Sequence, residues 1–166
     1  MTFARLSLMA ILMVLMSAVL SCSSHKVSFS LERPLIEMAH CSIGDFDVYL
    51  PASDSTISVP STEVIDRFKI AMKDKLDASL LFQTVYPYNV NATYEVVCTI
   101  TKSYTDVKKL SFAVRLKDQY SGEVLFGDSY EYAIDNWEAA EPTFREVSSK
   151  FVESLKTDAK RLEESD

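Results

Sequence analysis

The N-terminal segment decides which part of this chain has to fold as a domain. Arg5 is the only charged residue before Lys26, and residues 6–20 form a nearly unbroken apolar run that ends two residues before Cys22. A short basic head, an apolar stretch and a small-residue cut site are typical of a secretory signal. The apolar run is also shorter than the roughly 20 residues that a membrane-spanning helix needs. Residues 1–21 are therefore predicted to be a signal peptide, not a permanent membrane span.

The end of this segment, Val19-Leu20-Ser21-Cys22, resembles the lipobox of bacterial lipoprotein signals. In that family the cysteine becomes the lipidated N-terminus, so the resemblance implies a lipid anchor at Cys22. Ser23 and Ser24 follow where an inner-membrane retention aspartate would stand, which implies the outer membrane and a domain facing the periplasm. The alternative is an ordinary secretory signal that leaves a soluble protein. Both interpretations place the protein outside the cytoplasm.

Cleavage before Cys22 leaves 145 of the 166 residues, a typical length for one domain. We expect a lipidated tether and lead-in over residues 22–40 and a single domain over residues 41–166. Without the signal the chain carries 16 basic and 24 acidic residues. An acidic surface without a basic stripe argues against nucleic acid and against anionic headgroups as partners.

Hydrophobic periodicity predicts an α+β fold. Apolar residues recur every four positions from Val64 to Leu76, after a possible N-cap at Ser61, which is typical of an amphipathic helix. Thr143 and Glu146 have capping-box spacing at the start of a second such helix. Alternating patterns predict strands over 43–50, 82–86, 94–100, 110–117 and 124–133, the last with a possible bulge at Gly127. This order predicts a mostly antiparallel sheet of four to five strands with the two helices packed on one face.

Two cysteines remain in the domain. Cys41 and Cys98 form an even pair in an oxidising compartment, which makes a disulfide possible. The alternative is two separate buried thiols, because free cysteine behaves as a small apolar residue. Spacing alone does not decide between them.

Residues that carry catalytic or metal chemistry are scarce. The three glycines are too scattered to build a phosphate-binding loop or a nucleophile elbow. His40 and Cys41 are adjacent and point to opposite faces of an extended chain, so they do not make half of a metal site. Asp45 and Asp47 alternate with apolar residues and are expected to face solvent. We therefore expect no catalytic residue, no metal and no cofactor.

Aromatic residues suggest a partner surface. Tyrosines concentrate on the predicted meander, and Trp137 lies in an acidic connection before the last helix. Because tyrosine and tryptophan are enriched at protein interfaces, Trp137, Tyr130 and Tyr132 are the candidates for such a surface. The alternatives are that sheets favour tyrosine in any case, and that Trp137 forms a lid over the last helix.

The order of the segments resembles small outer-membrane lipoproteins that share the fold of the curli-secretion-channel periplasmic domain and the TolB N-terminal domain. The likeness rests on Asp45-Phe46-Asp47-Val48, the helix running into residues 76–82, the strand 94–100, residues 116–125 and the closing helix from Phe144. This chain departs from the common form of the family because no glycine stands directly after the first helix.

The resemblance implies a non-catalytic accessory or binding subunit of an envelope assembly, secretion or export complex. Its expected partners are the membrane, through the N-terminal lipid, and an envelope protein or further copies of itself. A periplasmic carrier of an apolar ligand and an enzyme of unrecognised type are the alternatives.

Overall fold

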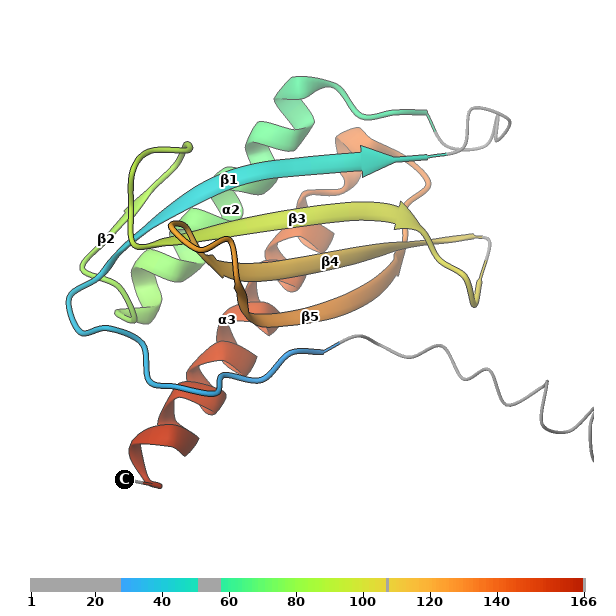
Figure 1. Ribbon diagram of the computed structural model, residues 1–166. Helices are drawn as coiled ribbons and strands as arrows, with labels where there is room; N and C mark the ends of the chain where they lie inside the picture. The colour runs from blue at the N-terminus through green and yellow to red at the C-terminus, as the bar shows by residue number, and fades with distance from the viewer. Residues whose placement is uncertain (1–27, 51–57, 107, 166) are drawn as a thin grey trace, which may run out of the picture.

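The computed structural model describes residues 28–50, 58–106 and 108–165, which form one α+β unit (Figure 1). A five-stranded mixed sheet carries two long helices on one face, as the sequence predicted. In chain order the elements are β1 (His40–Tyr49), α2 (Thr62–Ser79), β2 (Thr84–Tyr86), β3 (Tyr94–Lys102), β4 (Lys109–Asp118), β5 (Val124–Ala133), the short 3-10 helix η1 (Trp137–Ala139) and α3 (Glu141–Glu163).

The sheet has the strand order β2-β1-β3-β4-β5. The long β3–β4 and β4–β5 pairings are antiparallel, whereas β1 runs parallel to both of its neighbours. The helix α2 makes the crossover from β1 to β2, as a parallel pair requires. The sheet is therefore mostly antiparallel, with a parallel edge.

Strand β1 begins earlier than the alternation predicted, because a bulge changes which face its residues occupy. Ile43 pairs with Val96 and Phe46 pairs with Cys98, so β1 has one extra residue between them. Before the bulge the core-facing residues include Cys41 and Ile43, and after it Phe46. The simple alternation from Phe46 could not find this, since a bulge shifts the parity by one.

The two helices begin in different ways. The Ser61 hydroxyl accepts a hydrogen bond from the Val64 N–H at 3.4 Å, which confirms the predicted N-cap. Helix α3 has Ala140 at its N-cap with no side-chain hydrogen bond there, and it begins at Glu141. The predicted capping box of Thr143 and Glu146 is therefore wrong. Pro142 lies in the first turn, where a missing N–H costs nothing.

A cluster of phenylalanine rings joins both helices to the sheet. Phe68 of α2 has no exposed surface and stacks on Phe144 of α3, with ring centroids 4.7 Å apart. Its other contacts are edge-on to Phe46 of β1 at 4.9 Å and Phe112 of β4 at 5.8 Å. These rings fill the layer between the sheet and the helices.

The last part of the predicted lead-in belongs to the folded unit. Phe29 and Gly127 exchange two backbone hydrogen bonds of 2.8 and 3.0 Å, which adds a short bridge to the outer edge of β5. Leu31 is buried, and its N–H donates to the Asp158 carboxylate of α3. Gly127 keeps its regular pairing with Arg115, so the bulge predicted there is wrong; the register of β5 shifts between Val124 and Phe126 instead.

Candidate functional site

Cys22 and the predicted signal peptide lie outside the described residues. Within the described part of the chain, no helix is long and apolar enough to cross a bilayer.

The two cysteines of the domain are separate thiols. Cys41 and Cys98 lie on the neighbouring strands β1 and β3, but Cys41 is opposite Tyr94 and Cys98 is opposite Phe46. Four residues along β3 correspond to about 13 Å, well beyond the roughly 7 Å Cα separation that a disulfide can bridge. The structure therefore shows two separate buried thiols, which was the alternative to the disulfide. Burial raises the pKa of both thiols, because desolvation disfavours the thiolate.

Trp137 is the lid that the sequence left as an alternative. Its side chain is 6% exposed, and the indole lies over Phe144 at a centroid distance of 6.4 Å. The indole N–H donates a 2.5 Å hydrogen bond to the carbonyl oxygen of Ser58. A ring held in this way cannot anchor a partner without opening the loop, so the predicted partner surface is wrong at Trp137.

The two tyrosines of the predicted partner surface lie on the helix side of β5. Tyr130 is buried, and that burial raises its pKa. Tyr132 is half-buried against α3, where its hydroxyl accepts a 2.7 Å hydrogen bond from the Lys150 ammonium group. The same ammonium lies 5.2 Å from the centroid of the Tyr132 ring. Both tyrosines thus serve the packing of α3 on the sheet instead of forming an exposed patch.

No cluster of three or more histidine, cysteine, aspartate or glutamate side chains that could hold a metal ion occurs in residues 28–50, 58–106 and 108–165. Asp45 and Asp47 are exposed, as the alternation of their neighbours predicted. A shallow groove of about 460 Å³ lies between β5, α3 and Phe29. Its lining includes Lys150, Glu153 and Asp158, so it is not an apolar pocket.

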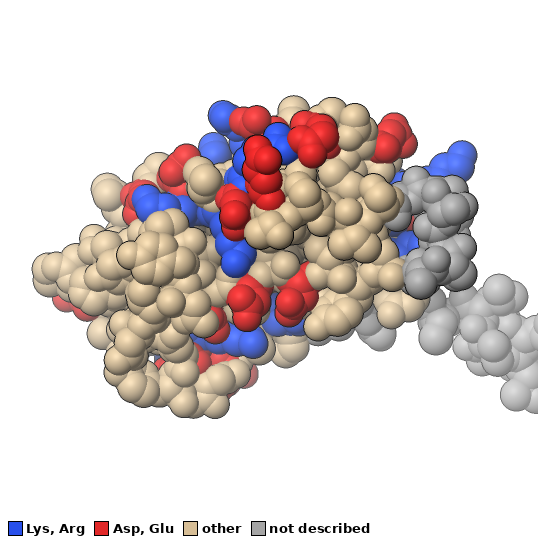
Figure 2. Space-filling view, turned by 90° about the horizontal axis from the view of Figure 1, so that it is seen from above, with Lys and Arg blue, Asp and Glu red and all other residues tan. Residues whose placement is uncertain are grey.

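The β2 end of the molecule has few charged residues, apart from Arg33, which pairs with Asp118 and Glu123 beside the 119–122 turn. Three segments form this neutral end, residues 34–40, 80–93 and 119–122, and their only charged residue is Glu37. Figure 2 shows the β2 end, at the left of the view, as mostly uncharged, whereas charged side chains gather over the middle of the molecule. A quarter of the residues in this chain are charged, whereas the 25 residues of these three segments include a single charged residue. The three segments therefore form a distinctive surface.

Hydrogen bonds hold the three segments of the neutral end together. The Gln83 N–H donates to the Ala39 carbonyl at 2.9 Å, which ties the second segment to the first. The Gln119 side chain donates to the Val90 carbonyl at 2.8 Å and accepts from the Ala92 N–H at 2.5 Å. The neutral end is therefore a connected surface and not three independent loops.

Large apolar side chains project from this surface. Their exposed fractions are 61% for Ile36, 71% for Met38, 87% for Leu80, 61% for Tyr88 and 81% for Tyr120. Met38 and Leu80 have φ angles of 56° and 60°, the left-handed region that side chains other than glycine disfavour. Leu80 occupies the left-handed position at the end of α2, where helices usually place a glycine.

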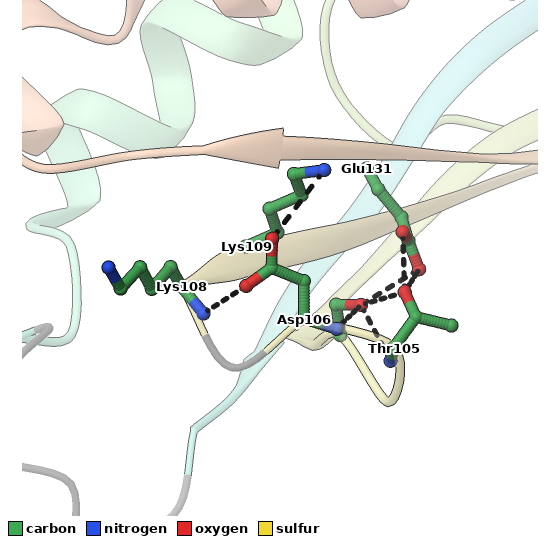
Figure 3. Close-up of polar contacts among 6 residues, drawn as sticks. Thr105, Asp106, Lys108, Lys109 and Glu131 are labelled. Atoms are coloured by element: carbon green, nitrogen blue, oxygen red, sulfur yellow. Dashed lines mark hydrogen bonds and ion pairs between the residues drawn. The ribbon is translucent and has the colours of Figure 1, made fainter.

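The opposite end carries charges and a polar network (Figure 3). Ser103 and Thr105 in the β3–β4 hairpin both hydrogen-bond the Glu131 carboxylate of β5. The Lys108 N–H donates to Asp106 at 3.0 Å, which is the main reason that the pKa of Asp106 lies below its ordinary value. Tyr104 is 97% exposed in this charged hairpin.

Two features of the sequence indicate the neutral end, although hydrophobic periodicity does not reveal either of them. Residues 78–94 hold no charged side chain, and residue 80, at the end of the first helix, is leucine where helices usually place a glycine. Which other segments join this stretch depends on strand order, which the pattern does not reveal.

The fold is shared with known bacterial proteins. No protein-family model and no curated protein sequence matches the chain. Two solved structures of PelC from Paraburkholderia phytofirmans, both dodecamers, match 78% of this chain at a TM-score of 0.53. They cover 94% and 96% of the PelC chain, with 10% and 12% identity. A DUF330 protein from Xanthomonas campestris matches at a TM-score of 0.51, with 10% identity over 81% of this chain and 95% of its own. At these identities the likeness shows the fold alone.

Proposed function

We propose that this protein is a non-catalytic envelope lipoprotein, held on the outer membrane by lipid at Cys22, that acts as an accessory or binding subunit of an envelope assembly or export complex. The observation that carries the proposal is the likeness to PelC over nearly the whole PelC chain, because PelC is a dodecamer. A protein of this fold can therefore work through association with copies or partners.

The outer face of the sheet supports a role in association. The helices cover one face of the sheet, and in Figure 1 no helix of the described residues covers the other face. Val97, Thr99 and Ala113 lie half-buried on that uncovered face, with short side chains. The same face also carries charged side chains, with Arg115 opposite Val97 and Lys117 opposite Glu95, so a partner chain there would meet both short and charged groups.

The alternative of an apolar-ligand carrier has less support. A ligand between sheet and helices would occupy the layer that Phe68, Phe112 and Phe144 fill, with ring centroids 4.7 to 5.8 Å apart. The groove beside α3 is lined by charged side chains. Binding a ligand in either place would require the core to open or an apolar molecule to contact ionic groups.

Cross-linking of the full chain in its own cell envelope tests this function. Cells expressing the wild-type protein and the Cys22→Ala variant are treated with a short amine-reactive cross-linker, and the membrane fraction is purified through a C-terminal affinity tag. We expect discrete, stoichiometric products that contain several copies or a defined envelope protein, and their loss in the variant. A wild-type protein that remains uncross-linked at its native level would overturn the role in assembly.

A further inference from the structure

The neutral end exposes large apolar side chains that do not pack in the core. Met38 and Leu80 are mostly exposed, so neither contributes to the core. Exposed apolar patches on small proteins usually mark a contact with another protein or with a membrane. The chemistry of the patch and the length of the chain in front of it decide between these two.

The left-handed backbone at Met38 and Leu80 points to a function for the two side chains. A bulky residue at a φ near 60° costs free energy that glycine would avoid. Backbone strain of this kind clusters at functional sites, where the surrounding structure holds it in place. At Met38 and Leu80 the strained residue is also one of the most exposed apolar residues of the protein.

The chain length allows the neutral end to reach the bilayer. Ser28 lies six positions after Cys22, and an extended chain of that length can span about 20 Å. Phe29 is fixed to Gly127 of β5, and Gly122 in the 119–122 turn lies five residues earlier in the chain, about 17 Å away in an extended strand. A lipid on Cys22 and the neutral end can thus reach the same membrane plane.

The chemistry of the patch suits a lipid interface. Tyr88 and Tyr120 have an apolar ring with a polar tip, the type of side chain that is enriched at the headgroup level of membranes. The three segments carry one carboxylate and no lysine or arginine, and Arg33 beside them is paired with Asp118 and Glu123, so attraction to anionic lipid is not part of the contact. The charged hairpin at the opposite end, with Asp106 and Lys108, is the part that would remain in water.

We propose that the neutral end docks on the uncharged surface of the bilayer that holds the lipid anchor, with Met38 and Leu80 inserted and the two tyrosines at the level of the headgroups. This inference rests on the anchor at Cys22 in the proposed function. It orients the domain with β2 toward the membrane and the β3–β4 hairpin away from it. The uncovered sheet face then stands at a steep angle to the bilayer and remains open to another chain.

Site-specific fluorescence quenching tests the orientation. The full chain is produced in a bacterium that processes lipoproteins, extracted in detergent and reconstituted into vesicles of phosphatidylethanolamine and phosphatidylcholine. Met38→Cys and Leu80→Cys carry an environment-sensitive probe, and Tyr104→Cys is the matched control, because Tyr104 is 97% exposed at the opposite end. Cys41 and Cys98 are buried and protonated, so they should not react with the probe.

Brominated phospholipids should quench the probes at positions 38 and 80 several-fold more strongly than the probe at position 104. Vesicle flotation, measured on the same samples, reports on the anchor separately. A chain that floats but shows equal quenching at both ends overturns the docking and leaves the anchor intact. A chain that does not float overturns the anchor, and the docking with it. Self-quenching at position 38 that disappears when unlabelled protein is added would assign the neutral end to a second copy instead.

Discussion

The indole N–H of Trp137 donates to the carbonyl oxygen of Ser58 at 2.5 Å, which joins the loop before α3 to the segment that leads into α2. The same ring lies over Phe144. The starting regions of both helices are therefore tied together by one side chain that the sequence pattern alone would place on the surface.

Replacing Trp137 with alanine should destabilise the protein by about 3 kcal/mol, in the range found for large buried aromatic residues. Trp137→Phe retains a ring but loses the donor, so it should cost about 1–2 kcal/mol. Urea unfolding measures both values, with Tyr104→Ala as an exposed control. Equal midpoints for wild type and Trp137→Ala would mean that the ring does not act as a lid.

Phe68 is the centre of the ring cluster, and truncating it should have the largest effect in α2. Phe68→Ala removes contacts to Phe46, Phe112 and Phe144 and should cost about 3–5 kcal/mol. Ile70→Ala in the same helix is the control, because Ile70 is 52% exposed and should cost less than about 1 kcal/mol. Similar losses for the two variants would contradict the packing of α2.

Leu80→Gly should stabilise the protein although it removes a large side chain. Relief of the left-handed strain is worth about 1–2 kcal/mol, and the greater freedom of glycine in the unfolded chain costs about 0.5–1 kcal/mol. The net gain should be about 0.5–1 kcal/mol, since a side chain that is 87% exposed contributes little burial. Leu80→Ala keeps the strain and should not gain. A lower stability for Leu80→Gly would show that the leucine packs on the fold.

Hydrophobic periodicity predicted the secondary structure because each of these elements has one solvent-exposed face and one buried face. Val64, Phe68, Met72 and Leu76 predicted α2, and Tyr94 to Ile100 predicted β3, with the core-facing residues that the structure shows. Periodicity could not predict the bulge in β1 or the place of β1 between β2 and β3, because those depend on pairing between distant segments.

The candidate site was less predictable than the fold. Trp137 and Tyr130 were expected on a surface because of their residue type, yet their environment buries them. The neutral end combines three segments that lie far apart in the sequence. Only the uncharged run over residues 78–94 and the missing glycine at Leu80 were visible in advance.

The buried thiols predict a loss of stability at high pH. The pKa of Cys41 and Cys98 is raised in the folded state, so the unfolded chain loses these protons first. Stability is then complete below the ordinary thiol pKa of about 8.5 and falls as the pH rises above it, by up to about 2.7 kcal/mol per pH unit for two thiols. Urea unfolding between pH 8 and pH 10, before most tyrosines ionise, should show this decline.

The Cys41→Ala/Cys98→Ala double variant provides the comparison for the pH dependence. It should be less stable at pH 8, because two buried side chains are shortened, but its stability should decline less steeply toward pH 10. Parallel pH profiles for the variant and the wild type would contradict the raised pKa of the thiols. A disulfide would remove the titration altogether and would be detected by a mass change on reduction.

The anchor at Cys22 is the claim on which both the envelope role and the orientation of the neutral end depend. Metabolic labelling with a clickable fatty acid, followed by denaturing purification of the full chain, measures it directly. The wild-type protein should carry the label and run at the mass of the processed chain. Cys22→Ala should carry none and retain its N-terminal segment. Label that persists on Cys22→Ala, or a processed wild-type chain without label, would contradict the account.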